Sequence, residues 1–257
     1  MDVNNKKILD DLNNRIDYVI NITDPTSKKV ICFNIINKKT LARAMSLFNK
    51  EPVTIEWIRS FEPNSVYFDI GANIGQFTIF AGVIKGCNIY AFEPESNNFQ
   101  GLCKNIYLNK LQNKVKAYPI GISDKTKFTN LYLDEFFKGS SHHSVDYQLD
   151  ISLKERKFKF SQGIFSTTLN DLIQKWNFDI PNYIKIDVDG IESKIIEQSE
   201  NILTNKDLKS ILIELNIDRN EDKLVINKLK DCGFKVDDKQ IQSALRENGC
   251  AEHLFFK

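Results

Sequence analysis

The chain has 257 residues, 42% hydrophobic and 27% charged, which suits one large α/β domain with a sizeable core, with or without a small additional element. Its 35 Lys and Arg residues balance 34 Asp and Glu residues, so the formal net charge is +1. A nearly neutral chain has no overall field to hold a polyanion, which excludes nucleic acid as the main partner.

The first part of the chain, residues 1–64, shows no regular alternation of strands and helices. It holds an expected leading helix, a possible strand at 29–35 and a helical segment at 40–50. Helical spacing around Trp57 predicts that this side chain packs beneath the leading helix. We interpret residues 1–64 as an extension that caps the substrate side of a domain formed by residues 65–257.

From residue 66 onward, short β-branched segments alternate with helical patterns, as in strand–helix units that build a parallel sheet. Most of the strand segments are continuous apolar runs, which is typical of strands covered on both faces. The predicted strands span residues 66–70, 88–92, 115–120, 183–188 and 210–215. The predicted helices span residues 75–85, 96–108, 169–176, 192–203 and 221–230.

Two segments depart from this alternation. Residues 121–164 are polar and mixed, with a candidate strand at 126–133, and are expected to form a long irregular insertion with a functional role. Near the end of the chain, candidate strands at 233–236 and 253–256 have only a loop between them. Without a crossover helix they are expected to pair antiparallel at the sheet edge. The whole pattern predicts a Rossmann-like α/β fold: a mainly parallel sheet with an antiparallel C-terminal strand and helices on both faces.

A glycine-containing loop follows the first of these strands. The strand ends at Asp69, and a helix begins near Gly75. Gly71 and Gly75 let the backbone turn tightly and approach a ligand closely, because neither carries a Cβ. Asp69 places an acceptor at the carboxyl end of a strand, where parallel sheets bind ligands. The spacing Gly-x-x-x-Gly differs from the Gly-x-Gly-x-x-Gly of dinucleotide-binding loops, which disfavours a nicotinamide cofactor.

A second acid, Glu93, ends the next predicted strand. Dinucleotide-binding folds use an acid roughly 20 residues after the glycine loop to hold ribose hydroxyls. A carboxylate suits this task because it accepts hydrogen bonds from both vicinal hydroxyls. Ser123 and Asp124 follow the third strand, where an acceptor would meet an adenine amino group.

With these features in place, the sequence resembles the FkbM-type methyltransferases from about residue 51 to the C-terminus. The motifs that carry the resemblance, in family order, are FDIGANIGQFT (68–78), AFEPESNNF (91–99), NIYLN (105–109), AYPIGISDKT (117–126), STTLNDLI (166–173), IKIDVDGIE (184–192), LIEL (212–215) and HLFF (253–256). The resemblance implies a Rossmann-like fold. It also implies transfer of the S-adenosylmethionine methyl group to a hydroxyl oxygen of a sugar, polyketide or other small molecule, leaving S-adenosylhomocysteine.

The resemblance also assigns cofactor contacts residue by residue. The residues that would cradle the methionine part are Asp69, Gly71, Asn73 and Gly75. Glu93 would hold the ribose, and Ser123 and Asp124 would lie beside the adenine. Thr78 is a further candidate contact, with a core or capping role as its alternative.

Acids also end the fourth predicted strand, where alternation puts Asp187 and Asp189 on one side of the chain. Three roles are open for Asp187: to receive the cofactor's amino group, to orient or deprotonate the attacking hydroxyl, or to bind Mg²⁺ together with Asp189. Positioning of cofactor or substrate is the preferred role, and no metal site is assigned. Glu192 is expected to complement the dipole of the helix that follows.

Three further residues are candidates for the general base. His142 and His143 lie in the 121–164 insertion, and at most one of this adjacent pair is expected to act, since neighbours point in different directions. A plain surface-loop role is the alternative. Glu214 would line the same crevice, and Asn216 stands where family members carry histidine, which leaves the identity of the base open.

The expected partner is a small-molecule or glycan hydroxyl acceptor; the sequence does not indicate an oligomeric state. The five cysteines have no zinc-ligand spacing, so free thiols in a reducing cytoplasm are expected. No stretch approaches the roughly 20 apolar residues of a membrane span. Two alternatives come from other classes: an NAD(P)-dependent oxidoreductase, which the glycine spacing disfavours, and a catalytically silent binding module.

Overall fold

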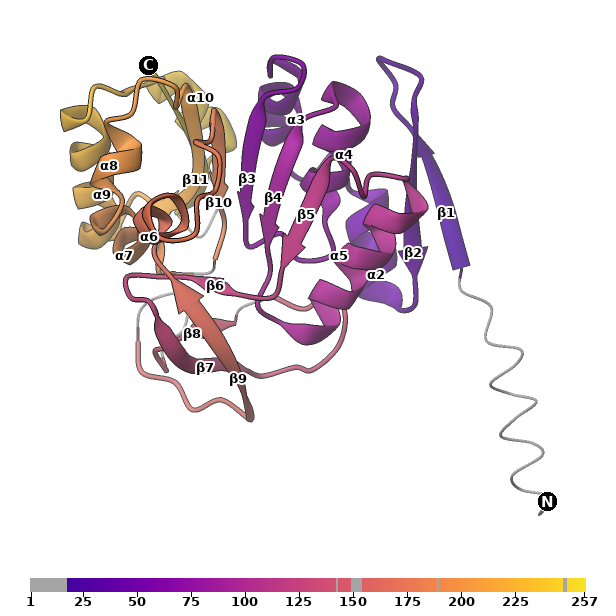
Figure 1. Cartoon of the computed structure of the whole chain (residues 1–257), viewed down its shortest axis with the longest axis horizontal. Helices are drawn as coiled ribbons and strands as arrows, with labels where there is room; N and C mark the ends of the chain where they lie inside the picture. Colours follow the sequence, from indigo (N-terminus) through magenta and orange to yellow (C-terminus); the bar gives the residue numbers. More distant parts are fainter. Residues whose placement is uncertain (1–17, 142, 149–153, 189, 247–248) are drawn as a thin grey trace.

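The computed structural model describes residues 18–141, 143–148, 154–188, 190–246 and 249–257 (Figure 1). The expected leading helix therefore lies outside the described residues, as do His142 and Asp189. In the parts of the chain that are described, no helix combines the length and apolar character needed to cross a bilayer.

A sheet of strands in the order β12-β13-β11-β10-β3-β4-β5 forms the centre of the described structure. Its parallel strands are β11 (Ser210–Asn216), β10 (Tyr183–Ile186), β3 (Val66–Ile70), β4 (Asn88–Phe92) and β5 (Val115–Tyr118). The C-terminal strand β13 (Cys250–Phe256) runs antiparallel to both β11 and β12 (Lys235–Val236). The predicted fold, with a mainly parallel sheet and an antiparallel last strand, is confirmed.

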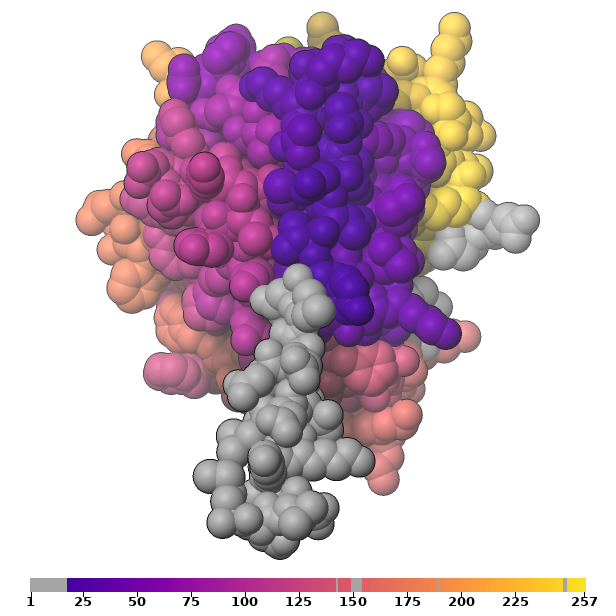
Figure 2. Space-filling view, turned by 90° about the vertical axis from the view of Figure 1, so that its right-hand side faces the viewer, coloured from indigo at the N-terminus to yellow at the C-terminus, as the bar shows by residue number. Residues whose placement is uncertain are grey.

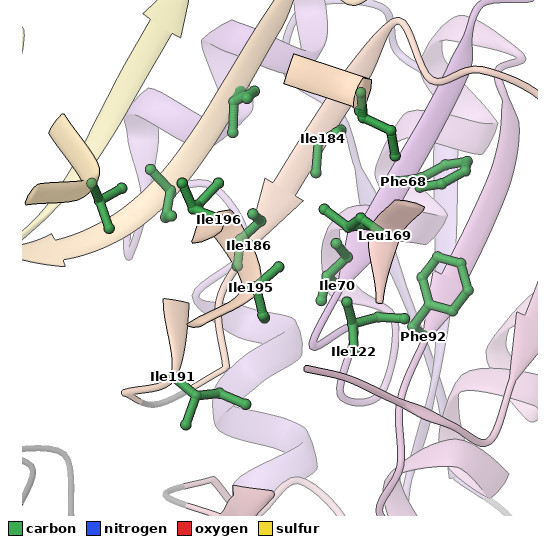
Figure 3. Close-up of a cluster of buried hydrophobic side chains, with 14 of the residues drawn as sticks. Phe68, Ile70, Phe92, Ile122, Leu169, Ile184, Ile186, Ile191, Ile195 and Ile196 are labelled. Atoms are coloured by element: carbon green, nitrogen blue, oxygen red, sulfur yellow. The ribbon is translucent and has the colours of Figure 1, made fainter. Parts of the chain in front are cut away.

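Helices cover both faces of this sheet, as predicted. Alternation along β3 sends Phe68 and Ile70 into one core and Tyr67 into the other. The first core, part of which Figure 3 shows, is covered by α6 (Leu169–Gln174), α7 (Glu192–Glu197), α8 (Glu200–Leu203) and α9 (Asn220–Asp231). The second is covered by α2 (Lys38–Met45), α3 (Pro52–Arg59), α4 (Gln76–Lys85) and α5 (Ser96–Leu108).

The extension contributes a hairpin of β1 (Tyr18–Thr23) and β2 (Val30–Ile35), of which only β2 was predicted. Figure 2 shows this hairpin in indigo along the middle of one face. Two asparagines of the NIYLN motif, in α5 and at its C-terminal cap, bind the edge of β2 that does not pair with β1. The amide oxygen of Asn105 accepts from the Asn34 backbone at 2.8 Å, and that of Asn109 accepts from the Cys32 backbone at 2.9 Å. The motif therefore attaches the hairpin to the domain.

Trp57 is buried, but the leading helix beneath which it was expected to pack lies outside the described residues. Its ring contacts Phe61, Tyr67 and Tyr183, at centroid distances of 4.7, 5.9 and 6.3 Å. Its indole N–H donates to the Ser210 hydroxyl at 2.8 Å. The partners are distant in sequence, so only the assembled sheet brings them to α3.

Two predicted elements are interrupted. The predicted strand 115–120 breaks at Pro119, which has no N–H to continue a ladder, and the chain re-enters pairing as β6 (Gly121–Ile122) in a second sheet. The predicted helix 192–203 is two short helices, α7 and α8, separated near Ser199. The hydroxyl of Ser199 donates to the Ile195 carbonyl at 2.5 Å, and its side chain competes there with regular helix bonding.

Other boundaries differ by a few residues. The helical segment expected at 40–50 is α2, which begins earlier because Asn37 and Thr40 form a capping box. The expected loop between the last two strands contains a short helix, α10 (Asp238–Ala244), which begins where the Asp237 side chain accepts from the Lys239 backbone at 2.9 Å.

The described part of the insertion is irregular only between its strands. It forms a second sheet in the order β6-β9-β7-β8, with β7 (Lys127–Leu133), β8 (Ser144–Val145) and β9 (Phe160–Thr167). Of these strands only β7 was predicted. The inner face of this sheet carries Leu131, Val145 and Ile164 into the first core. In Figure 1 the second sheet lies beneath the carboxyl ends of β3 and β4, and it covers the edge of the central sheet where ligands bind.

Candidate active site

The glycine loop after β3 is wedged between two neighbouring strands. The Gly71 N–H donates to the Phe92 carbonyl at 3.0 Å, and the Asp187 N–H donates to the Ile70 carbonyl at 3.1 Å. Gly71 has a φ of +81°, and a Cβ there would lie 1.9 Å from the Asp187 carbonyl oxygen. Glycine is therefore required at this position by backbone conformation and by contact with β10, independently of any ligand.

A pocket of about 890 Å³, its open mouth included, adjoins this loop at the carboxyl ends of the strands. The predicted site residues that line it are Gly71, Asn73, Glu93, His143, Asp187 and Glu214. Its apolar lining comes from Ile70, Phe92, Ile120, Ile122, Leu131, Val145 and Val188. The structure thus brings predicted cofactor residues and predicted catalytic residues to one cavity.

Three of the predicted cofactor residues of the glycine loop lie outside the pocket lining. The Thr78 hydroxyl donates to the Asp69 carboxylate, and both side chains are buried. Burial raises the pKa of Asp69. A Cβ at Gly75 would lie 2.5 Å from Leu102 Cδ1, so this glycine admits α5 beside the start of α4. Thr78 takes the core role that the sequence left open.

Glu93 is buried at the end of β4 and faces the pocket. Its Oε2 accepts from the Asn73 backbone at 2.7 Å and its Oε1 from the Glu95 backbone at 2.9 Å. Burial raises the pKa of Glu93 to about 7. A carboxylate oxygen has lone pairs for two hydrogen bonds, and each oxygen of Glu93 accepts only one here. Both oxygens can therefore accept a further bond from a vicinal diol.

Ser123 and Asp124 are not part of the pocket lining. The Ser123 hydroxyl donates to Asp124 at 3.1 Å, and the Tyr147 hydroxyl donates to Asp124 at 3.3 Å. The residues just before them, Ile120 and Ile122, line the pocket instead. The break at Pro119 turns this part of the chain toward the second sheet, which a continuous strand would not have done.

A buried lysine that the sequence analysis did not single out lies beside Asp187. Lys185 Nζ is 2.6 Å from the Asp187 carboxylate and 3.9 Å from Glu51. Burial works to raise the pKa of Asp187, but the Lys185 ammonium outweighs it and lowers the pKa to about 2. A carboxylate of such low pKa is a weak proton acceptor near neutral pH. Asp187 is therefore suited to accepting hydrogen bonds rather than protons.

Glu214, on β11, has the opposite character. Its carboxylate accepts from Arg246 at 2.6 Å. Burial and the charge of Asp187 nevertheless raise the pKa of Glu214 to about 7. A carboxyl group that titrates near neutral pH inside a pocket is matched to general-base catalysis.

The loop that carries Ser140 and His143 to the pocket is held by several polar side chains. Asn98 accepts from the Gly139 N–H at 2.7 Å and donates to the Ser140 carbonyl at 3.0 Å. Asn73 donates to the same Ser140 carbonyl at 2.7 Å. These bonds fix one wall of the pocket against the glycine loop.

Sequence reasoning missed four cations of this region: Arg43, Lys50, Lys185 and Arg246. A signal was available for Lys185, because a lysine inside an apolar buried strand is rarely without a specific partner. None was available for the other three, since they come from the extension and the C-terminal segment. In the described ranges, no group of three or more His, Cys, Asp or Glu residues is arranged to hold a metal ion.

Glu192 stabilises the turn after β10 as well as beginning α7. Its Oε1 accepts from the Gly190 N–H at 3.1 Å and from the Val188 N–H at 3.4 Å. Burial raises the pKa of Glu192 from 4.5 to about 8. Val188 lines the pocket next to Asp187, so the bond to Glu192 helps to hold this part of the pocket wall.

This raised pKa predicts how stability depends on pH. The folded state holds the Glu192 proton more tightly than the unfolded state, so this contribution is present below about pH 4.5 and is lost as the pH rises through about 8. We expect thermal unfolding scans between pH 5 and 9 to show a smaller loss of Tm in Glu192→Gln than in the wild type. Glu197→Gln, an exposed position on the same helix, is the control. Equal slopes in both variants would contradict the assignment.

The glycine loop, the acid at the end of the next strand and the pocket at the sheet edge define a nucleoside-binding α/β protein. The profile of the family described as Methyltransferase FkbM domain matches residues 69–236, and the chain belongs to this family of methyltransferases.

Two further similarities agree with this assignment. Hexuronic acid methyltransferase AglP of Haloferax volcanii is 20% identical over 186 residues, 72% of this chain and 71% of that protein. The crystal structure of Methyltransferase FkbM from Methylobacillus flagellatus KT superposes with a TM-score of 0.51 at 18% identity. That alignment covers 77% of this chain but 44% of the other, so the chain spans less than half of that protein.

Proposed function

We propose that the protein transfers the methyl group of S-adenosylmethionine to a hydroxyl oxygen of a small molecule, namely a sugar or glycan. The observation that carries this proposal is that the expected cofactor residues and the expected catalytic residues line the same pocket. The first set is Gly71, Asn73 and Glu93, and the second is Asp187 and Glu214. The similarity to a protein named for hexuronic acid supports the sugar acceptor.

The described residues fit this cofactor. Ile120, Ile122 and Phe92 supply an apolar surface for a purine ring, and Glu93 offers two carboxylate oxygens to a ribose diol. Asp187 offers its charge to an ammonium group near the Gly71 backbone. Ser123 and Asp124, which lie outside the lining, are not needed for this fit.

When bound, S-adenosylmethionine supplies a methyl group that is electrophilic because it is attached to a sulfonium. The protein's task is to align an acceptor oxygen with that methyl group and to keep water away. In the proposed mechanism Asp187 accepts a hydrogen bond that orients cofactor or acceptor, and Glu214 takes the hydroxyl proton. His143, which also lines the pocket, is the alternative proton acceptor.

Two segments shape the acceptor side in this proposal. Arg43 and Lys50 bring the extension, residues 1–64, to the pocket lining. Ser140, His143 and Val145 do the same for the 121–164 insertion. The first placement supports the interpretation of the extension as a cap on the substrate side, and the second adds the insertion to the pocket wall.

Calorimetric titration with S-adenosylhomocysteine and with NADH tests the cofactor class. We expect the first to bind and the second not to. Glu93→Gln should weaken S-adenosylhomocysteine binding about tenfold to hundredfold, the range of a lost charge-assisted hydrogen bond. Since Glu93 has a pKa of about 7, wild-type affinity should fall as the pH drops below 7, and the variant should lose this dependence.

Glu62→Gln, at an exposed position outside the pocket lining, is the matched control for the titration. Binding of NADH without binding of S-adenosylhomocysteine would overturn the proposal and favour an oxidoreductase. Binding of neither would favour a catalytically silent module.

A further inference from the structure

Arg43 reaches the pocket from α2, outside the segment that the family profile matches. Its Nε donates to the Gly139 carbonyl at 2.9 Å. Within the described parts of the chain, its two terminal nitrogens, Nη1 and Nη2, make no hydrogen bond or ion pair. The bond from Nε restrains the guanidinium and leaves its two terminal NH₂ groups available to a planar partner.

The acids of the pocket do not require Arg43 as a counter-ion. Asp187 is paired with Lys185 and Glu214 with Arg246, each at 2.6 Å. The oxygens of Glu93 accept from backbone N–H groups. The pKa values of Glu93 and Glu214 are both about 7, so part of the negative charge of the pocket is absent at neutral pH.

Lys50 adds a second cation to the same wall. Its ammonium lies 3.4 Å from Glu51, and its side chain is 51% exposed. Arg43 and Lys50 are close enough to Asp187 for their charges to act on it. The wall formed by α2 and the segment after it therefore carries positive charge, and the terminal nitrogens of Arg43 are not bonded to any described acid.

We propose that Arg43, assisted by Lys50, binds a carboxylate in this pocket. The inference rests on the proposed function, which supplies two sources of that group: the methionine carboxylate of the cofactor and an acidic group on the acceptor. Both present the same planar pair of oxygens to the guanidinium fork. A ligand without negative charge would leave the guanidinium of Arg43 without a partner.

The test compares ligands that differ by the carboxylate. S-adenosylhomocysteine and 5′-methylthioadenosine share the adenosine thioether, but the second lacks the amino-acid part. Glucuronic acid and glucose, titrated with S-adenosylhomocysteine present, differ in the same way on the acceptor side. Each ligand is titrated against the wild type, Arg43→Gln and the control Arg156→Gln, which changes an arginine outside this pocket lining.

If the cofactor supplies the carboxylate, Arg43→Gln weakens S-adenosylhomocysteine about tenfold or more and leaves 5′-methylthioadenosine within about twofold. If the acceptor supplies it, both nucleosides bind unchanged and glucuronic acid weakens relative to glucose. Equal weakening of both nucleosides would show that Arg43 acts through the Gly139 loop, and this would overturn the proposal. An unchanged affinity for all four ligands would overturn it as well.

A different result would contradict the proposed function. Wild-type protein that binds neither nucleoside would contradict methyl transfer. In that case, a loss of glucuronic acid affinity in Arg43→Gln would still support the carboxylate site. Both variants should stay close to the wild type in thermal unfolding, since each substitution removes one contact of a side chain outside the buried set: the Arg43 bond to Gly139 or the Arg156 ion pair with Asp134.

Discussion

Glu214→Gln is expected to lower the rate of methyl transfer by about a hundredfold to ten-thousandfold, the usual contribution of a general base. The wild-type rate should rise with pH through about 7 and then level, because the ionised carboxylate is the form that accepts a proton. The variant should lose this limb. The measurement is the pH profile of labelled methyl transfer to a mixture of neutral and acidic monosaccharides, with S-adenosylmethionine saturating at every pH because Glu93 also has a pKa of about 7.

A lower rate could also result from damage to the structure, and the substitution by glutamine is chosen to keep such damage small. Glutamine keeps the size of the side chain, and Arg246 retains Glu252 as an ion-pair partner. Glu56→Gln, an exposed position on α3, is the control and should keep both rate and profile. A Glu214→Gln variant that keeps the limb near pH 7 would contradict the assignment and direct attention to His143.

Gly71→Ala is expected to destabilise the protein by about 2–5 kcal/mol and to abolish cofactor binding. The left-handed backbone at Gly71 disfavours alanine by about 1–2 kcal/mol, and overpacking typically adds about 1–3 kcal/mol. The clash is with the backbone of Asp187, which has no flexible side-chain end that would yield. Relief would have to separate β3 from β10 and displace Asp187 from the pocket.

Two other glycines separate these causes. Gly86 has a φ of +67° but open space around its Cβ position, and Gly163 has open space without a left-handed φ. Thermal unfolding should rank Gly163→Ala as the mildest change, Gly86→Ala as intermediate and Gly71→Ala as the most severe. Titration with S-adenosylhomocysteine should detect a loss only in Gly71→Ala. Equal effects at Gly71 and Gly86 would contradict the proposed clash.

The sequence predicted the parallel part of the central sheet because its strands are apolar and covered on both faces. Such runs stand out whatever their partners are, as 66–70 and 88–92 do. The second sheet was largely missed, because β6, β8 and β9 are short or half-exposed and have no continuous apolar run. Their pairing depends on contacts between distant segments, which local patterns do not encode.

The candidate site divides in the same way. Gly71, Glu93, Asp187 and Glu214 were identified because each lies at or just after the end of a predicted strand, and strand ends meet at one edge of a parallel sheet. Asn73 came from the resemblance to the FkbM-type methyltransferases. The hydrogen bond from Thr78 to Asp69 and the position of Ser123 and Asp124 outside the lining could not be predicted, since burial and the break at Pro119 depend on the packed sheets.

Local sequence therefore specified the fold class, the glycine loop and the acids at the strand ends, because period, spacing and residue chemistry are local properties. Only tertiary structure brought Arg43 from the extension and Arg246 from the C-terminal segment to the same pocket. The pKa values of about 2 at Asp187 and about 7 at Glu214 likewise arise from burial and from neighbours such as Lys185 and Arg246. Charge interactions depend on distance in space, so the roles of these two acids separate only after folding.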